Sequence, residues 1–236
     1  MWLKDSSIGR KLVMSLTGLA LVFFLLFHGV MNVVVVFSED AYNAICHFLG
    51  ANWYALVGTV GLALLVLLHF CYAFYLTIQN RAARGNDRYA VTAKKEGVEW
   101  ESENMLVLGI IVIGFLVLHL YNFWFRMQLA EITDGATAPL ADATNGAHYV
   151  KELFTGYATG NHVAALIYCG LYLIWLCALW FHLRHGVWSA LHTLGWNNLV
   201  WMKRIKVIGV CLATLVVLPF VVVVLYYLGV GLAALC

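Results

Sequence analysis

The sequence is short of charge. Only 11% of its 236 residues are Asp, Glu, Lys or Arg, whereas 63% are hydrophobic. A soluble domain carries about 25% charged residues, which help to cover its surface. This shortage excludes most cytosolic enzymes, nucleic-acid-binding domains and disordered tails. The net charge of +2 is too small to indicate an acidic partner.

Proline and paired cysteines are scarce as well. Two prolines in the whole chain favour long, uninterrupted helices. The six cysteines form neither C-x-x-C nor C-x-x-C-H, which excludes covalent haem attachment through such a motif. Four of them lie inside apolar runs, where a free thiol packs as a small hydrophobic group. We therefore expect no disulfide framework.

What the chain has instead is five apolar runs, each long enough for a helix to cross a bilayer core about 30 Å thick. No run alternates with period two over ten residues, as membrane strands would. The first is too long for a signal-peptide core and lacks a cleavage site, so we expect it to be retained. The sequence predicts an all-α integral membrane bundle of five transmembrane helices in one domain over 1–236. The five runs are 12–37, 53–79, 104–125, 161–181 and 207–235.

The basic residues give an orientation. Lys and Arg gather in loops on the cytoplasmic side of a membrane. Twelve of the 14 fall before the first run or in the second and fourth loops, and only Arg126 and Lys151 fall in the others. We expect a cytoplasmic N-terminus and an outer C-terminus. The twelve are Lys4, Arg10, Lys11, Arg81, Arg84, Arg88, Lys94, Lys95, Arg184, Lys203, Arg204 and Lys206.

Histidine is the ionisable residue inside the predicted spans, which contain no Asp, Glu, Lys or Arg. An ionisable side chain in hydrocarbon is costly and by default indicates function. Because successive helices run in opposite directions, His28 and His119 fall at one depth, toward the outside. His69 and His182 fall at a second depth, toward the cytoplasm. For any single histidine, a neutral ring bonded to a neighbouring backbone group is an equally good explanation. Two such layers are harder to explain in that way.

Two layers of two histidines suit a metal with two axial positions, which is the situation of haem iron. Zinc would need four protein ligands, or three and a water. We therefore expect two non-covalent haem b groups, each with two histidine ligands. Filling both axial positions disfavours oxygen binding and favours electron transfer. His162, at the outer start of the fourth span, is a fallback ligand.

Other residues are weaker candidates for the surroundings of haem or quinone. Gly58 lies about three turns before His69 on the same helix face and would let a flat ring approach, although ordinary helix packing explains it equally well. Asn32 and Asn122, which follow His28 and His119, face haem or quinone or else bond to backbone. Four residues near the N-terminus are candidates to meet haem propionates, although membrane anchoring alone would explain the two basic ones. These four are Arg10, Lys11, Ser15 and Thr17.

The chain resembles the two-haem, five-helix cytochrome b subunit of bacterial succinate dehydrogenases and quinol:fumarate reductases. The most specific segment is 181–189, F-H-L-R-H-G-V-W-S, which is similar to the family's F-H-x-x-x-G-x-W-S stretch, whose histidine binds haem. The resemblance pairs His69 with His182 for the inner haem iron and His28 with His119 for the outer one. Some members carry a proton-transferring Glu where this chain has Trp180, so we expect no such proton path.

The resemblance implies a respiratory-chain subunit in the bacterial cytoplasmic membrane. It would anchor a flavoprotein subunit and an iron–sulfur subunit on the cytoplasmic side, with no activity on succinate or fumarate alone. It would exchange electrons with a membrane quinone, for which menaquinone is favoured. A higher oligomer of the complex fits the resemblance, and nucleic acid does not. An inner docking surface would use the basic loops and Glu96, Glu99, Glu101 and Glu103.

Quinone chemistry also needs protons, and the short outer loop offers Glu39, Asp40 and His47 as catalytic acid–base groups. Solvated loop charges are the alternative for each of them. Two rival functions remain open. One is a di-haem cytochrome b of another membrane oxidoreductase, of the hydrogenase or formate dehydrogenase type. The other is a proton-coupled transporter with a histidine relay, which would need broken helices or repeated halves.

Overall fold

The computed structural model describes residues 6–84, 99–133 and 142–235. These residues form helices and no strand, and five of the helices are long and apolar enough to cross a membrane. The protein is therefore an all-α, multi-pass membrane protein. The long helices are α2 (Ser7–Val33), α4 (Trp53–Arg84), α5 (Trp100–His119), α8 (His162–Thr193) and α9 (Leu199–Ala233).

Most of these helices extend beyond the runs expected from hydropathy. α5 begins four residues before position 104, and α8 continues twelve residues beyond position 181. Hydropathy marks only the part of a helix that lies in lipid, whereas the helix itself continues to a capping residue. Ser6 and Asn198 supply such caps, because their side chains accept hydrogen bonds from backbone amides in the first turns of α2 and α9. Arg184, expected in a loop, therefore lies on a helix.

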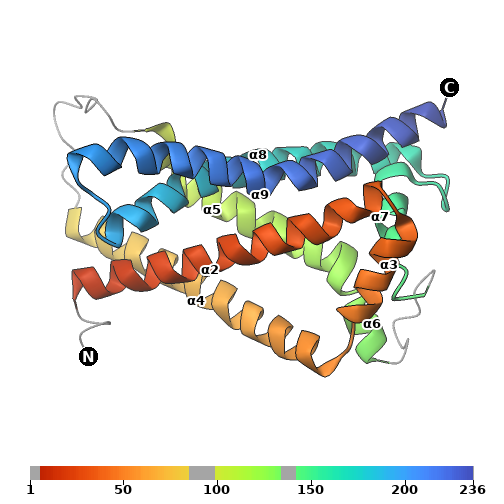
Figure 1. The fold of residues 1–236 in the computed structure, drawn as a ribbon, viewed down its shortest axis with the longest axis horizontal. Helices are drawn as coiled ribbons and strands as arrows, with labels where there is room; N and C mark the ends of the chain where they lie inside the picture. The colour runs from red at the N-terminus through yellow and green to blue at the C-terminus, as the bar shows by residue number, and fades with distance from the viewer. Residues whose placement is uncertain (1–5, 85–98, 134–141, 236) are drawn as a thin grey trace.

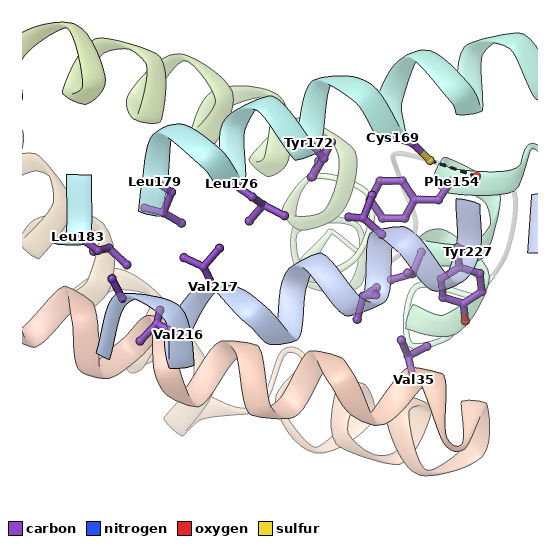
Figure 2. Packing of buried hydrophobic residues seen from close by; sticks show 14 of the residues in the cluster. Val35, Phe154, Cys169, Tyr172, Leu176, Leu179, Leu183, Val216, Val217 and Tyr227 are labelled. Carbon is purple, nitrogen blue, oxygen red and sulfur yellow. Dashed lines mark hydrogen bonds between the residues drawn. The ribbon is translucent and has the colours of Figure 1, made fainter. Parts of the chain in front are cut away.

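The long helices run side by side along the longest axis of the molecule (Figure 1). The start of α2 and the end of α9 lie at opposite ends of the bundle, as an odd number of crossings requires. We call the end at which α2, α5 and α9 begin the basic end. The buried core lies mainly between α8, α9 and α2: Leu179 and Val217 lie between α8 and α9, and Val35, which follows α2, lies on the other side of α9 (Figure 2).

Small residues let these helices approach closely. A Cβ at Gly29 of α2 would lie 3.1 Å from the Phe220 ring of α9. A Cβ at Gly209 of α9 would lie 2.9 Å from the Arg184 carbonyl oxygen of α8. Close backbone approach at glycine is a common way in which membrane helices associate. These contacts fix α2 and α8 against α9.

Helix α4 is different. No residue in its most apolar stretch is buried within the described part of the chain. It packs mainly on α2 and diverges from it along its length (Figure 1). A Cβ at Gly58 or at Gly61 would meet no atom within 4 Å. The apolar surface of α4 is therefore left uncovered by its own chain.

The outer loops of the sequence prediction contain helices. We call α3 (Glu39–Phe48), α6 (Gln128–Ile132) and α7 (Gly146–Thr155) the cap, because they gather at the end opposite the basic end (Figure 1). Asn43 joins α3 to α7: its amide nitrogen donates to Asn145 and its amide oxygen accepts from the backbone amide of Ala147. On the other side, the Cys169 thiol of α8 contacts the Phe154 carbonyl oxygen of α7 (Figure 2).

The basic end holds a partly buried charge cluster. Glu101 of α5 is 3% exposed and forms an ion pair with Arg184 of α8 at 3.0 Å. Glu99 pairs with Lys206 of α9 at 3.1 Å. The expectation that Glu101 belongs to an exposed docking loop is therefore wrong, because the residue begins a helix and is enclosed by α8. Glu96 lies outside the described residues.

Candidate functional site

The bundle brings His28 of α2 and His119 of α5 together. Their ring centroids lie 5.9 Å apart, with the ring planes at 87°. Phe24 stacks on His28 at 5.3 Å, and Phe220 of α9 lies 5.5 Å from it. Trp175 of α8 lies 5.5 Å from His119. Two imidazoles from different helices thus meet inside an aromatic shell.

His69 of α4 and His182 of α8 lie toward the basic end, within electrostatic range of each other. Each ring rests against a glycine. The Cε1 atom of His69 lies 3.3 Å from the position of a Cβ at Gly18 of α2. The Cε1 atom of His182 lies 3.8 Å from the position of a Cβ at Gly109 of α5. The missing side chain at Gly18 lets the His69 ring lie close to α2, whereas a Cβ at Gly109 would make only an ordinary contact with His182.

The nitrogen atoms of these rings are unequally satisfied. Thr17 lies 3.0 Å from Nδ1 of His69, and the Asn32 amide nitrogen lies 3.3 Å from Nδ1 of His28. The Nδ1 atoms of His119 and His182 are buried without any hydrogen-bond partner. Among the described residues, none forms a hydrogen bond with Nε2 of His69, His119 or His182. Unpaired buried polar atoms are costly and call for an explanation.

These observations fit haem. A haem iron takes two axial protein ligands, and the macrocycle supplies the other four. Metal-to-imidazole bonds of about 2 Å on opposite sides of one metal would place two ring centroids about 6 Å apart, close to the 5.9 Å between His28 and His119. Nε2 of His69, His119 and His182 would supply lone pairs, whereas Nε2 of His28 lies 3.4 Å from the Asn32 amide nitrogen. The face of α4 at Gly58 is left uncovered by the described residues.

A π-helix, η2 (Leu120–Trp124), follows His119 directly. Such segments are rare and often occur at functional sites. It holds Asn122, which is 4% exposed and donates a hydrogen bond to the Tyr172 hydroxyl of α8 at 3.1 Å. Asn32 accepts a hydrogen bond from the Tyr42 hydroxyl of α3, also at 3.1 Å. Both asparagines therefore bond to tyrosines, and the amide nitrogen of Asn32 also donates to the His28 carbonyl oxygen at 2.8 Å, as the backbone alternative expected.

The four residues near the start of α2 that were candidates to meet haem propionates differ in burial and in contacts. Thr17 is buried and contacts His69. Ser15 is also buried, and its hydroxyl donates to the Lys11 carbonyl oxygen. Arg10 is half-buried and Lys11 is exposed. Of these four, the structure brings only Thr17 to a histidine of the pairs.

The acid–base candidates Glu39, Asp40 and His47 are exposed on α3, a helix rather than the expected loop. Glu39 forms a surface ion pair with Lys151 of α7 at 3.3 Å. Helix α3 is linked to His28 by Tyr42 instead, because the Tyr42 hydroxyl donates to Asn32, and Asn32 lies beside the His28 ring.

Two histidines outside the pairs have other roles. Nδ1 of His162 lies 2.7 Å from the Thr155 carbonyl oxygen, so this fallback ligand joins α8 to the cap. His185 has a buried Nδ1 and packs on Trp188 with ring centroids 4.9 Å apart.

Sequence reasoning missed several contributors to the site. Gly18, Gly109, Tyr42 and Tyr172 touch a paired histidine or its neighbouring asparagine. Glycine within an apolar run signals a close approach, but it does not say which side chain approaches. A signal for α3 was present, because Ser38 followed by two acidic residues is a typical helix start.

Burial also sets the acidity of groups in the cap. It raises the pKa of the Cys46 thiol to about 11 and raises the pKa of the Tyr42 hydroxyl. Both groups are neutral near pH 7. The cap thus presents uncharged groups on its inner side and charged ones, such as Glu39, to solvent.

Comparisons of the chain with protein-family models, with curated proteins and with solved structures gave no match.

Proposed function

We propose that the chain is the membrane-anchor and electron-transfer subunit of a succinate:quinone oxidoreductase with two haem b groups. The observation that carries the proposal is the meeting of the His28 and His119 rings, which come from two different helices, inside the bundle. The distance of 5.9 Å between the His28 and His119 ring centroids supports it. The resemblance of 181–189 to a haem-binding stretch of that family supports the specific assignment.

The histidines would act as axial ligands. His69 and His182 would hold the inner haem iron, and His28 and His119 the outer one. Bound haem b would supply a one-electron redox centre. Two imidazoles on each iron would disfavour oxygen binding and favour electron transfer. Phe24, Phe220 and Trp175 pack around the outer pair.

The two ends of the bundle would have different roles. The flavoprotein and iron–sulfur subunits would dock at the basic end, on the cytoplasmic side of a bacterial membrane. A quinone, with menaquinone favoured, would react near the cap. There Glu39, Asp40 and His47, which are exposed on α3, would exchange protons with solvent.

The first test is the haem content of the purified chain, measured as pyridine haemochrome. We expect two non-covalent haems per polypeptide, and one after His28→Ala, His69→Ala, His119→Ala or His182→Ala. His162→Ala is the matched control, because that ring bonds to the cap, and it should keep both haems. A colourless wild-type chain would overturn the proposal.

A second measurement addresses the specific complex. Isolation from native membranes should recover a flavoprotein and an iron–sulfur protein with the chain, and succinate should reduce the bound haems. Reduction by hydrogen or formate, but not by succinate, would assign the chain to another di-haem oxidoreductase.

A further inference from the structure

Thr17 joins α2 to the histidine of α4. Its side chain is buried, at 6% exposure, and its Oγ1 lies 3.0 Å from Nδ1 of His69. The same Oγ1 lies 2.8 Å from the Val13 carbonyl oxygen and 3.1 Å from that of Met14. One hydroxyl group therefore faces one ring nitrogen and two backbone oxygens.

The number of hydrogens decides the roles. A threonine hydroxyl has one hydrogen, and a carbonyl oxygen can only accept. Donation to the Val13 carbonyl oxygen, the nearest of the three atoms, leaves the hydroxyl oxygen to accept a hydrogen bond from Nδ1–H of His69. A neutral imidazole with its hydrogen on Nδ1 keeps a lone pair on Nε2. The opposite arrangement would place a hydrogen on Nε2 and block it as a ligand.

The neighbouring residue supports this contact. A Cβ at position 18 would lie only 3.3 Å from Cε1 of His69, so the glycine there lets the ring reach α2. Across the pair, Nδ1 of His182 has no partner. Among the described residues, Nδ1 of His69 therefore has a polar side-chain partner, whereas Nδ1 of His182 has none.

We infer that Thr17 is the positioning residue of the inner haem site. It fixes the tautomer and the orientation of His69 and, by accepting from Nδ1–H, makes that imidazole a stronger donor to iron. Partners of ligating histidines act in this manner in metal sites generally. The inference rests on the proposed function and gives Thr17 a role other than contact with a haem propionate.

The test compares Thr17→Val, which keeps the shape and removes the hydroxyl, with Thr17→Ser, which keeps it. Redox titration of the purified holoprotein should show a higher midpoint potential for the inner haem in Thr17→Val, because a less basic ligand and a more apolar wall both favour ferrous iron. We expect a shift of up to about tenfold in the equilibrium, or about 59 mV for one electron. The low-spin electron paramagnetic resonance signal of that haem should change as well.

The chain offers matched controls. Thr77 of α4 is a half-buried helix hydroxyl that donates only to the Ala73 carbonyl oxygen. Thr77→Val should leave both haems unchanged, and Thr17→Ser should restore the inner potential. The outer haem is an internal control in every variant. Thr17→Ala carries the same expectation as Thr17→Val without added bulk, should the valine variant fail to accumulate.

The outcomes separate this inference from the proposed function. Two haems in Thr17→Val or Thr17→Ala with unchanged potential and signal would overturn the inference and leave the proposed function standing. A Thr17→Ser protein as altered as Thr17→Val would also overturn it. So would a labelled-histidine nitrogen spectrum of the ferrous wild type in which Nδ1 of His69 lacks a proton. Absence of haem from the wild type would instead overturn the proposed function.

Discussion

His28 and His119 lie 91 residues apart in the sequence and on different helices, yet their rings meet at 87° inside the bundle. Each has a neighbour that fixes it: Asn32 lies beside the first ring and Trp175 beside the second. Under the proposed function the relationship would be reciprocal, because one metal would need both rings.

This reciprocity predicts non-additive loss. The double variant His28→Ala/His119→Ala should keep one haem per polypeptide, as each single variant does, because either substitution already removes the outer site. The cross-pair double variant His28→Ala/His69→Ala should keep none. Haem content by pyridine haemochrome measures both. One haem remaining in the cross-pair variant would show that the rings are paired differently.

The ion pair between Glu101 and Arg184 predicts a stability effect. Glu101→Gln removes the charge that faces the guanidinium and should lower stability by about 2 kcal/mol. The full effect of breaking a buried pair is larger, but the Arg184 side chain is 30% exposed and partly solvated. Thermal unfolding in detergent measures the change. The control is Glu103→Gln at an exposed position of the same turn, which should have little effect.

The thiol of Cys46 reports on the cap. Since its pKa is about 11 instead of 9.0, the thiolate fraction at pH 8 is about a hundredfold lower than for an ordinary thiol, so alkylation should be slow there and accelerate as the pH rises toward 11. Rapid alkylation of the wild type at pH 8 would contradict the burial of this thiol.

Gly146→Ala should make the Cys46 thiol more accessible to alkylation. A Cβ at Gly146 would collide with Sγ of Cys46, so the substitution should destabilise the contact between α3 and α7 by about 1–3 kcal/mol. Alkylation of Cys46 at pH 8 should then become faster. Gly170→Ala is the comparison, because a Cβ there meets no atom within 4 Å. Equal rates in the two variants would show that the cap tolerates the added methyl group.

Labelling can determine the orientation in the membrane. Asp40 is exposed on the cap and Ser102 is exposed at the basic end. With the N-terminus cytoplasmic, Asp40→Cys should react with a membrane-impermeant maleimide in intact cells, and Ser102→Cys only after permeabilisation. The reverse pattern would invert the orientation expected from the Lys and Arg distribution and would place the partner subunits at the cap.

Depth in the bundle could be predicted from the sequence because it depends on little more than helix rise and direction. Once five runs alternate across a membrane, position 28 of the first and position 119 of the third must fall at a similar level. Rotation about the helix axis is a different matter. That His69 turns toward Thr17 depends on which surfaces of α2 and α4 pack, and Gly18 controls that approach.

The cap and the charge cluster were not predicted for a related reason. α3 and α7 are short and only moderately apolar, so a search for apolar runs passes over them, although Ser38 and Asn145 cap their first turns. The burial of Glu101 arises because α8 continues beyond its apolar part and places Arg184 beside α5. Hydropathy identifies lipid contact and says little about where helices continue in water.

The π-helix after His119 has a consequence for sequence change. Each hydrogen-bonded loop of such a helix contains one residue more than the corresponding loop of an α-helix. Deleting a single residue between positions 120 and 124 would therefore let the segment relax into regular α-helix instead of breaking it. The helix would survive, but everything beyond the deletion would rotate by about 100°, and Asn122 would lose Tyr172.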